Sequence, residues 1–386
     1  MDVLDQGFMA QALRLARRGY FTADPNPRVG CIIVRDGEVL GSGWHHQAGT
    51  AHAEINALQQ ALVPGGEVNS GRVRGATAYV TLEPCCHQGR TGPCTEALIS
   101  AGIRRVVVAM QDPNPLVAGM GLTRLREAGI EVVVGPGQAE AEALNAGFIA
   151  RMSRGRPLVR CKLAMSLDGR TALATGESQW ITSTAARQDV QHLRAASSAI
   201  MTGIGTVLAD DPALTVRNIA CDPGVVDESG LLMDGSLRQP LRIVVDSHAR
   251  LPAESRLLQV PGKVLWATST LAAPSLVAAQ LSLLTLPMDK TQRIDLMALM
   301  QALAGYELNE VLLEAGATLS GAMLSAGLID ELVIYMAPKL MGNAARGLFD
   351  LPWLTNMAQC VDIEISDIRA VGRDWRISAR VAPKSG

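Results

Sequence analysis

The chain lacks the features that mark membrane, secreted and nucleic-acid-binding proteins. No apolar run approaches the ~18 residues that a bilayer span needs, and the first ten residues carry Asp2 and Asp5 where a secretory signal would be positively charged. The formal net charge of −2 gives no excess of basic side chains to bind a phosphate backbone, and the aromatic content of 3% provides few rings on which bases could stack. We therefore expect a cytoplasmic protein that acts on a small molecule, with neither membrane nor nucleic acid as partner.

The seven cysteines do not form a disulfide framework. Their number is odd, and only Cys85, Cys86 and Cys94 lie close together. Secreted scaffolds have dense, even sets of cysteine. Reduced thiols are expected, and the crowding at 85–94 favours a metal site.

Length and hydrophobic content predict two globular domains. The 386 residues are 48% hydrophobic and include 37 glycines, a balance typical of α/β layers. A basic seam at 151–157 places the boundary at 145–157, which gives an N-terminal domain of residues 1–148 and a C-terminal domain of residues 149–386. The acidic, aperiodic stretch 218–238 is interpreted as a surface excursion of the second domain.

Short β-branched runs alternate with segments of helical spacing in both halves. In the first half the pattern predicts strands at 29–34, 76–82, 104–109 and 130–134, and helices at 5–18, 51–62, 95–101 and 122–128. In the second half it predicts strands at 158–164, 199–202, 241–246, 263–267, 310–314 and 331–336. Such alternation predicts an α/β fold, with an α/β/α sandwich in the first half.

The first half contains a metal-binding motif in three separate segments: His52-Ala53-Glu54, Pro84-Cys85 and Cys94. One imidazole and two thiolates leave the fourth position of a tetrahedral zinc ion open for water. The metal lowers the pKa of that water, and Glu54 is expected to take its proton and deliver one to a departing amine. The H-x-E…P-C pattern is found in zinc deaminases of nucleobases.

The signature also predicts local structure. Positions i and i+2 of a helix point about 200° apart, so His52 and Glu54 are expected at a first helical turn. Cys94 is expected to begin the next helix, whose dipole favours a thiolate. Two alternatives stay open: a closed structural site with Cys86 or His87 as fourth ligand, and Cys86 in place of Cys85.

Asn26 lies between Pro25 and Pro27, just before the first predicted strand. A rigidly held amide suits the edge of a pyrimidine, and the nearby zinc signature favours this role over an ordinary loop. His45 and His46 receive no role beyond solvated or supporting ones.

Seven motifs occur in one order along the chain: Asp24–Cys31, His52–Glu54, Thr81–Cys85, Gln111–Pro115, Lys162–Arg170, Gly176–Thr182 and Leu208–Arg217. Together they resemble the bifunctional deaminase/reductases of riboflavin biosynthesis, and the match continues to Pro338–Gly342. The resemblance implies a cytidine-deaminase-like domain followed by a dihydrofolate-reductase-like domain. It implies zinc-dependent deamination of 2,5-diamino-6-ribosylamino-4(3H)-pyrimidinone 5′-phosphate. Reduction of the ribosyl group by NADPH would then give 5-amino-6-ribitylamino-uracil 5′-phosphate.

The resemblance also implies the residues of the second site. Substrate would contact Ser178, Arg194, Leu214, Arg217 and Glu314. NADPH would contact Ala164, Trp180, Thr206, Asp210, Ser247, Gly316, Ala317, Thr318, Leu319, Ser320 and Gly321. Asp210 would also be catalytic, where hydride reaches the ribose. The residues alone show only that a strand at 311–314 runs into a small-residue turn, which opens a helix suited to a pyrophosphate or merely to packing.

The chain departs from the family pattern at two positions near the proposed ligands, and its sequence disfavours two other functions. Cys86 stands where the family usually has Ser, and Gly92 where it has Pro. A nucleic-acid base deaminase with a targeting module would need a basic, aromatic face, and a non-catalytic zinc scaffold would give Glu54 no purpose. Cytidine-deaminase-like domains commonly self-associate, so we expect a homo-oligomer, with a dimer favoured.

Overall fold

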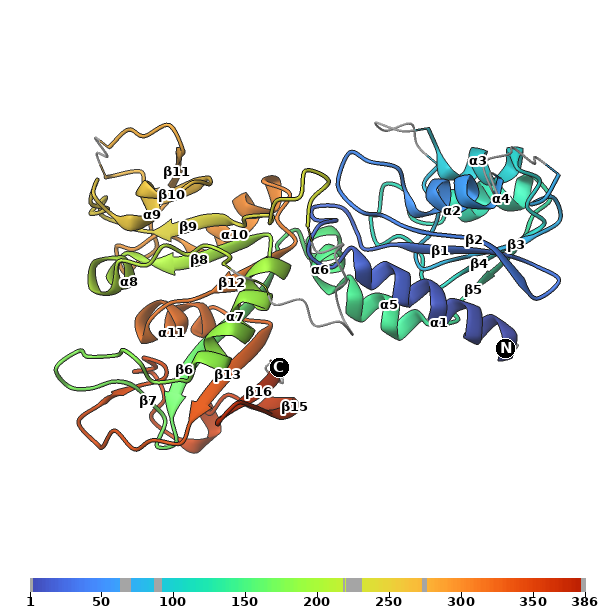
Figure 1. The fold of residues 1–386 in the computed structure, drawn as a ribbon. Coiled ribbons are helices and arrows are strands. Elements are labelled where there is room, and N and C mark those ends of the chain that lie inside the picture. Colours follow the sequence, from blue (N-terminus) through green and yellow to red (C-terminus); the bar gives the residue numbers. More distant parts are fainter. Residues whose placement is uncertain are drawn as a thin grey trace. The chain divides into compact units, whose positions relative to one another are not determined.

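The structure, a computed structural model, describes residues 3–62, 71–86, 92–217, 219, 231–272 and 276–382. The chain divides into two compact units (Figure 1). The first unit comprises residues 1–155 and 221–238, and the second comprises 156–220 and 239–386. His87, an alternative ligand in the sequence analysis, and residues 218 and 220–230 of the predicted excursion lie outside the described residues. No described helix is both long and apolar enough to cross a membrane.

The first unit is built on a five-stranded sheet of order β2-β1-β3-β4-β5. Its strands are β1 (Gly30–Arg35), β2 (Glu38–Trp44), β3 (Thr77–Val80), β4 (Arg105–Val108) and β5 (Glu131–Val134). β1 runs antiparallel to both of its neighbours, and β3, β4 and β5 are parallel. The unit's helices are α1 (Val3–Arg18), α2 (Ala53–Leu62), α3 (Cys94–Ser100), α4 (Met120–Glu127), α5 (Gln138–Leu144) and α6 (Ala146–Arg154).

Alternating strand residues build a core on each face of this sheet. Cys31, Ile33 and Val106 pack beneath α2, α3 and α4, whereas Ile32 and Val107 pack against α1 and α5. This is the period-2 alternation of a sheet covered on both faces, and it confirms the predicted α/β/α sandwich (Figure 1).

The second unit contains a nine-stranded sheet of order β11-β10-β9-β8-β12-β6-β13-β16-β15. These strands are β6 (Leu158–Ser166), β8 (Ala199–Gly203), β9 (Leu241–Val245), β10 (Val264–Ser269), β11 (Leu281–Leu286), β12 (Glu310–Leu313), β13 (Glu331–Ala337), β15 (Ile363–Val371) and β16 (Asp374–Val381). The strands from β11 to β13 are parallel, and β16 and β15 are antiparallel to their neighbours. A small separate sheet pairs β7 (Arg170–Ala172) with β14 (Arg346–Gly347).

Helices cover both faces of the parallel part. They are α7 (Thr184–Ala196), α8 (Ile204–Asp210), α9 (Arg256–Gln259), α10 (Leu296–Gly305) and α11 (Ala317–Ser325), with a 3₁₀ helix η3 (Met357–Gln359) near the end. α10 and α11 pack on the largest core cluster, while α7, α8 and α9 pack on residues of the opposite face. The carboxyl ends of the parallel strands therefore meet at one edge, where such folds bind ligands.

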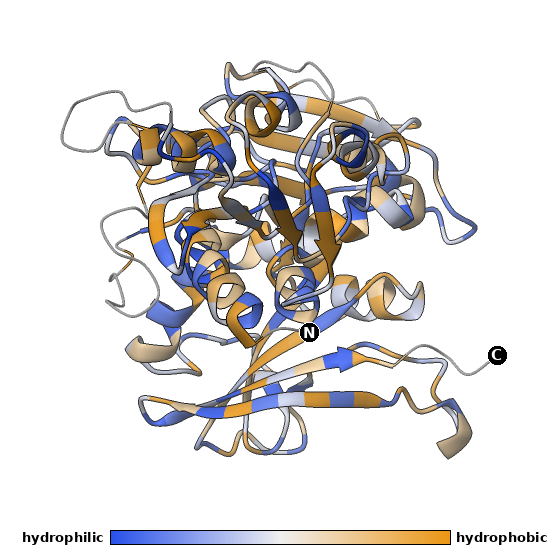
Figure 2. Cartoon of the chain, turned by 90° about the vertical axis from the view of Figure 1, so that its right-hand side faces the viewer, coloured by the Kyte–Doolittle hydropathy of each residue, from blue (hydrophilic) through white to orange (hydrophobic). Residues whose placement is uncertain are grey.

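Every predicted strand overlaps an observed one, and four predicted helices match α1 to α4. The prediction missed β2, β7, β11, β14 and the β15–β16 hairpin. The hairpin is solvent-exposed along most of β15, so it has no buried face to produce a hydrophobic pattern. Figure 2 shows mixed apolar and polar segments along the strands next to the C-terminus.

The stretch 218–238 was expected to belong to the second domain; residue 219 does, but residues 231–238 do not. These residues group with the first unit. Arg238 Nε donates to the Phe21 carbonyl at 2.9 Å, and the Met233 N–H donates to Gln47 Oε1 at 3.1 Å. Long-range polar contacts thus decide where this segment packs, and an aperiodic sequence gives no sign of them.

Candidate active sites

Three predicted ligands come together in the first unit. His52 immediately precedes α2, Cys94 is the first residue of α3, and Cys85 lies in the loop after β3. Their ligand atoms all lie within 4.8 Å of one another. The Nδ1 atom of His52 is 3.5 Å from Cys85 Sγ and 3.3 Å from Cys94 Sγ.

The donor set fits zinc with one position left for another ligand. Among the described residues, no further His, Cys, Asp or Glu joins the group, and Cys86 stays outside it. The Cys94 N–H donates to Cys85 Sγ at 3.4 Å. The Cys94 side chain and then His52 lower the pKa of Cys85, while the same contact with Cys85 raises the pKa of Cys94. One of the two thiols is therefore ready to bind as a thiolate, and zinc would displace the proton of the other.

Glu54 is buried beside the metal ligands, as the second residue of α2. Burial and, next, the negative charge of Cys85 raise its pKa to about 7. No described arginine or lysine pairs with it. A carboxyl group with this pKa can both accept and give up a proton near neutrality, which is what a general acid/base requires.

The close approach of α2 to β2 sets the position of His52 and Glu54. A Cβ on Gly43 of β2 would lie 2.6 Å from the Ala53 carbonyl oxygen, so a side chain here would push the start of α2 away. Glycine at this position lets the helix begin directly against the sheet.

Asn26 is held by a residue to which the sequence analysis gave no role. The Asn26 amide nitrogen lies 3.0 Å from His45 Nε2, and His45 Nδ1 lies 3.2 Å from the Ala51 carbonyl. Burial lowers the pKa of His45 to about 4, so the ring is neutral; Nδ1 donates to Ala51, and Nε2 accepts from Asn26. His45 therefore fixes which way the Asn26 amide faces.

Glu83 is a second residue that sequence reasoning missed. Its buried carboxylate accepts four backbone hydrogen bonds, from the N–H groups of Asp112, Gly119, Gly121 and Leu122. It thereby ties the loop that carries Cys85 to the start of α4. The sequence did contain one sign of this role: Glu83 is a charged residue directly after an apolar run that predicts a strand.

In the second unit a cavity of about 1810 Å³ opens at the carboxyl ends of the parallel strands. That is larger than the ~300–1,000 Å³ of an ordinary small-molecule pocket and leaves room for two ligands together. Most predicted residues of this site line it: Ala164, Ser178, Trp180, Arg194, Thr206, Asp210, Leu214, Arg217, Ser247, Glu314, Gly316, Ala317, Thr318 and Leu319.

Two predicted cofactor residues do not line this cavity. Ser320 is fully buried, and its hydroxyl bonds to Cys161 Sγ and the Ala315 carbonyl. A Cβ on Gly321 would lie 2.1 Å from the Asp350 carbonyl oxygen. In this structure both residues serve the packing of α11.

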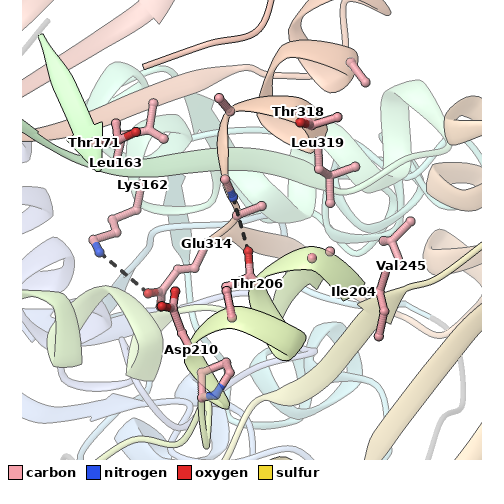
Figure 3. Close-up of a pocket in the computed structure, with 18 of the residues that line it drawn as sticks. Lys162, Leu163, Thr171, Ile204, Thr206, Asp210, Val245, Glu314, Thr318 and Leu319 are labelled. Atoms are coloured by element: carbon pink, nitrogen blue, oxygen red, sulfur yellow. Dashed lines mark hydrogen bonds and ion pairs between the residues drawn. The ribbon is translucent and has the colours of Figure 1, made fainter. Parts of the chain in front are cut away.

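Two cations lie next to Glu314 in this cavity, and Figure 3 shows one of them, Lys162. Arg194 binds its carboxylate through two hydrogen bonds of 2.6 and 3.0 Å, and Lys162 Nζ lies 3.7 Å away. Burial alone would raise the pKa of Glu314, but the charges of Arg194 and Lys162 prevail and lower it to about 2. Lys162 is a third residue that the sequence analysis did not single out; a cation inside an apolar strand was its signal.

The pairing with Glu314 changes the expectation for Arg194, which the family resemblance assigned, like Arg217, to substrate binding. Its remaining guanidinium nitrogen donates to the Thr215 carbonyl at 3.0 Å. Arg217 is exposed and is held through its backbone, whose N–H donates to Gln191. Arg217 is therefore the freer of the two to meet a phosphate.

Near the start of α11, Thr206 Oγ1 accepts the Gly316 N–H at 3.3 Å (Figure 3). On the neighbouring α8, Asp210 accepts from the Ser178 hydroxyl at 3.4 Å. Predicted cofactor and substrate residues thus contact one another directly.

The fold and these sites define a two-domain enzyme, a zinc-binding deaminase joined to a reductase. Residues 3–110 match the family model of the cytidine and deoxycytidylate deaminase zinc-binding region, and residues 157–377 match that of the RibD C-terminal domain. The chain belongs to the RibD family of bifunctional riboflavin biosynthesis proteins.

Relatives match along nearly their whole length. The chain is 52% identical to the riboflavin biosynthesis protein RibD of Escherichia coli, over 96% of this chain and 97% of that protein. It is 45% identical to the Haemophilus influenzae protein, with 96% of each covered.

Solved structures agree. Acinetobacter baumannii RibD superposes with a TM-score of 0.86 at 44% identity, covering 98% of this chain and 99% of that one. A deaminase/reductase from Thermotoga maritima gives 0.82 at 30% identity, with the same coverage.

These findings confirm the predicted fold class, a cytidine-deaminase-like domain and a dihydrofolate-reductase-like domain, and the predicted bifunctional activity in riboflavin biosynthesis. The enzyme binds zinc through a His/Cys/Cys site, and its reductase uses NADPH. Its substrate is a small pyrimidine. The alternatives of a nucleic-acid deaminase and a non-catalytic scaffold are left without support.

Proposed function

We propose that the first unit hydrolyses the 2-amino group of 2,5-diamino-6-ribosylamino-4(3H)-pyrimidinone 5′-phosphate. Water adds at ring carbon 2, the carbon–nitrogen bond breaks, and ammonia leaves. The name of the Thermotoga maritima relative, a diaminohydroxyphosphoribosylaminopyrimidine deaminase, supports this substrate. The enzyme acts in the cytoplasm, where Cys85 and Cys94 stay reduced.

His52, Cys85 and Cys94 hold the zinc ion, which when bound acidifies a water molecule. Glu54 takes the proton of that water and passes a proton to the departing amino group. The raised pKa of Glu54 supports both transfers. Asn26, oriented by His45, presents its amide to the pyrimidine edge.

The second unit reduces the ribosyl group of the deaminated product to a ribityl chain, giving 5-amino-6-ribitylamino-uracil 5′-phosphate. The ring of the ribosylamine opens to an imine, and carbon 1′ receives a hydride supplied by NADPH while one proton is taken up. The reductase part of the Thermotoga maritima relative's name supports this step.

We assign roles in reduction to the polar residues of the second unit's cavity. Asp210, on α8, lies where the ribose is reduced, and Ser178 bonds to it. Arg217 meets the substrate phosphate, and the ionised Glu314 accepts hydrogen bonds from ribose hydroxyls. Thr206, Ser247 and the start of α11 hold NADPH, whose pyrophosphate suits a helix N-terminus.

One observation carries this proposal: the described chain contains a buried carboxyl beside a zinc-type cluster and, separately, a cavity of about 1810 Å³ lined by an ionised glutamate. The test is a paired assay on zinc-replete protein. Ammonia release from the diaminopyrimidine nucleotide is measured without NADPH, and NADPH oxidation is measured after its addition. Ammonia release followed by oxidation is expected. Oxidation of NADPH by the undeaminated nucleotide at the same rate would contradict the order of the steps.

We also propose a homodimer formed along β15. This strand is the edge of the nine-stranded sheet, and Ile363, Ile365 and Ile368 are 43–53% exposed on it. Exposed apolar edges invite pairing with another strand, and a second copy offers a matching one. Sedimentation should show a dimer that I365K/I368K converts to monomer. L116K, which alters an exposed leucine of the first unit, should leave it dimeric.

A further inference from the structure

The residues 231–238, here called the return segment, have no part in the two reactions proposed above. They lie within the part of the sequence that matches the reductase family model, yet they group with the deaminase unit. The segment is ordered by its own turn: the Leu232 N–H donates to the Ser236 carbonyl, and Asp234 accepts from the Ser236 N–H, both at 2.9 Å.

Arg238 anchors one end of the return segment to the loop before Asn26. Its Nε donates to the Phe21 carbonyl at 2.9 Å, and its Nη1 lies 3.4 Å from Asp24 Oδ2. The two side chains are only 14% and 12% exposed. Water therefore screens this ion pair less than a surface pair.

The other end of the return segment meets a second loop. The Met233 N–H donates to the Gln47 side chain at 3.1 Å, two residues beyond His45. His45 and Asn26 are themselves joined by a 3.0 Å hydrogen bond. The return segment thus bridges the two loops that meet at the Asn26 amide.

We propose that Arg238 is a positioning residue of the deaminase: through Asp24 and Phe21 it holds the loop that presents Asn26 to the pyrimidine. The inference rests on the proposed role of Asn26. Arg238 bonds to the loop before Asn26, whereas the zinc ligands and Glu54 belong to other segments: the starts of α2 and α3 and the loop after β3. Loss of Arg238 should therefore weaken substrate binding and spare the chemical step.

The experiment compares R238A with R72A in the full-length protein. Arg72 is a matched control because it also bonds a backbone carbonyl, that of Ala61, and a carboxylate, that of Glu38, within the same unit. For R238A we expect the KM of deamination to rise about tenfold, with kcat, zinc content and melting temperature close to wild type. R238K should fall between R238A and wild type, and R72A should match wild type.

A second measurement stands apart from activity. Amide hydrogen exchange at Ala23 and Asn26, whose N–H groups donate to Gly19 and Ala23, should be faster in R238A and unchanged in R72A. Unchanged exchange in R238A overturns the inference, as does a wild-type KM or a loss of kcat together with zinc. Wild-type protein that released no ammonia would refute the proposed function instead, and the exchange result would still decide the role of Arg238.

Discussion

Each half of the molecule buries one glutamate in its site, and the two are in opposite states. Glu54 has no arginine or lysine paired with it among the described residues, and burial raises its pKa to about 7. Glu314 is also largely enclosed, with its side chain 10% exposed, but Arg194 and Lys162 lower its pKa to about 2. The same side chain thus becomes a proton carrier in one half and a permanent charge in the other.

The neighbours decide the difference, because burial acts on both carboxyls in the same direction. Hydrolysis needs a group that changes its protonation state during the reaction, whereas holding sugar hydroxyls needs a constant acceptor. The comparison predicts that the two halves can be disabled separately.

The largest expected effect comes from removing the metal. A chelator strong enough to extract zinc should abolish ammonia release, since the His52, Cys85 and Cys94 site is the source of acidified water. NADPH oxidation with supplied deaminated substrate should continue at its original rate. Adding zinc back should restore ammonia release; loss of both activities on chelation would contradict two independent sites.

The E54Q substitution should have the second largest effect and reduce the rate of deamination by about 10³-fold. Glutamine fills the same buried space but can neither take up nor release a proton near neutral pH. Zinc content should be unchanged, because Glu54 is not a zinc ligand. Reduction of the deaminated substrate, assayed on the same preparation, should match wild type. A folded E54Q protein that still released ammonia at the wild-type rate would remove the carboxyl from the mechanism.

E314Q should lower the kcat/KM of reduction by about 10²-fold, because Arg194 and Lys162 lose their shared counter-charge. The matched control is E310Q, on the same strand β12. Glu310 is buried and pairs with Arg160, outside the cavity. E310Q should lower thermal stability while keeping reductase kinetics, and equal kinetic losses in both variants would assign Glu314 a purely structural role.

The smallest effect is on acid stability. A carboxyl with a lowered folded-state pKa stabilises the fold above its ordinary pKa of 4.5, and that contribution is lost as the pH falls toward about 2. Glu314 can contribute up to about 3 kcal/mol in this way. Calorimetric melting between pH 5 and pH 3, about the range that linkage predicts, should show a steeper decline for wild type than for E314Q. Parallel declines would mean that the ion pair adds nothing net.

The sequence predicted best where the chemistry is local. His52 and Glu54 are two residues apart and Cys94 begins a helix, so one motif and one helical turn were enough to place them. The metal site and the strands of both buried sheets followed from spacing and hydrophobic runs. Ser320 and Gly321 belong to the same small-residue turn as the cavity-lining residues, but helical periodicity turns them toward the core.

The features that the sequence did not predict depend on contacts between residues that lie far apart in the chain. Glu83 and Lys162 stand out as charged residues in apolar runs, but the role of Glu83 depends on backbone groups about thirty residues away and that of Lys162 on Glu314. The return segment shows the limit most clearly, since nothing in its composition indicates which unit it contacts. Exposed strands such as β15 are missed for a related reason, because a strand without a buried face leaves no pattern.

The position of the return segment in the sequence also affects how the two activities could be separated into two chains. Because β6, β7, α7, β8 and α8 of the reductase unit precede Arg238 in the chain, they are synthesised before the deaminase unit is complete. A gene split between residues 155 and 156 would leave the deaminase product without Arg238. Fission of this protein into two separate genes would therefore need a second cut after residue 238, or a new anchor for the loop at Asp24.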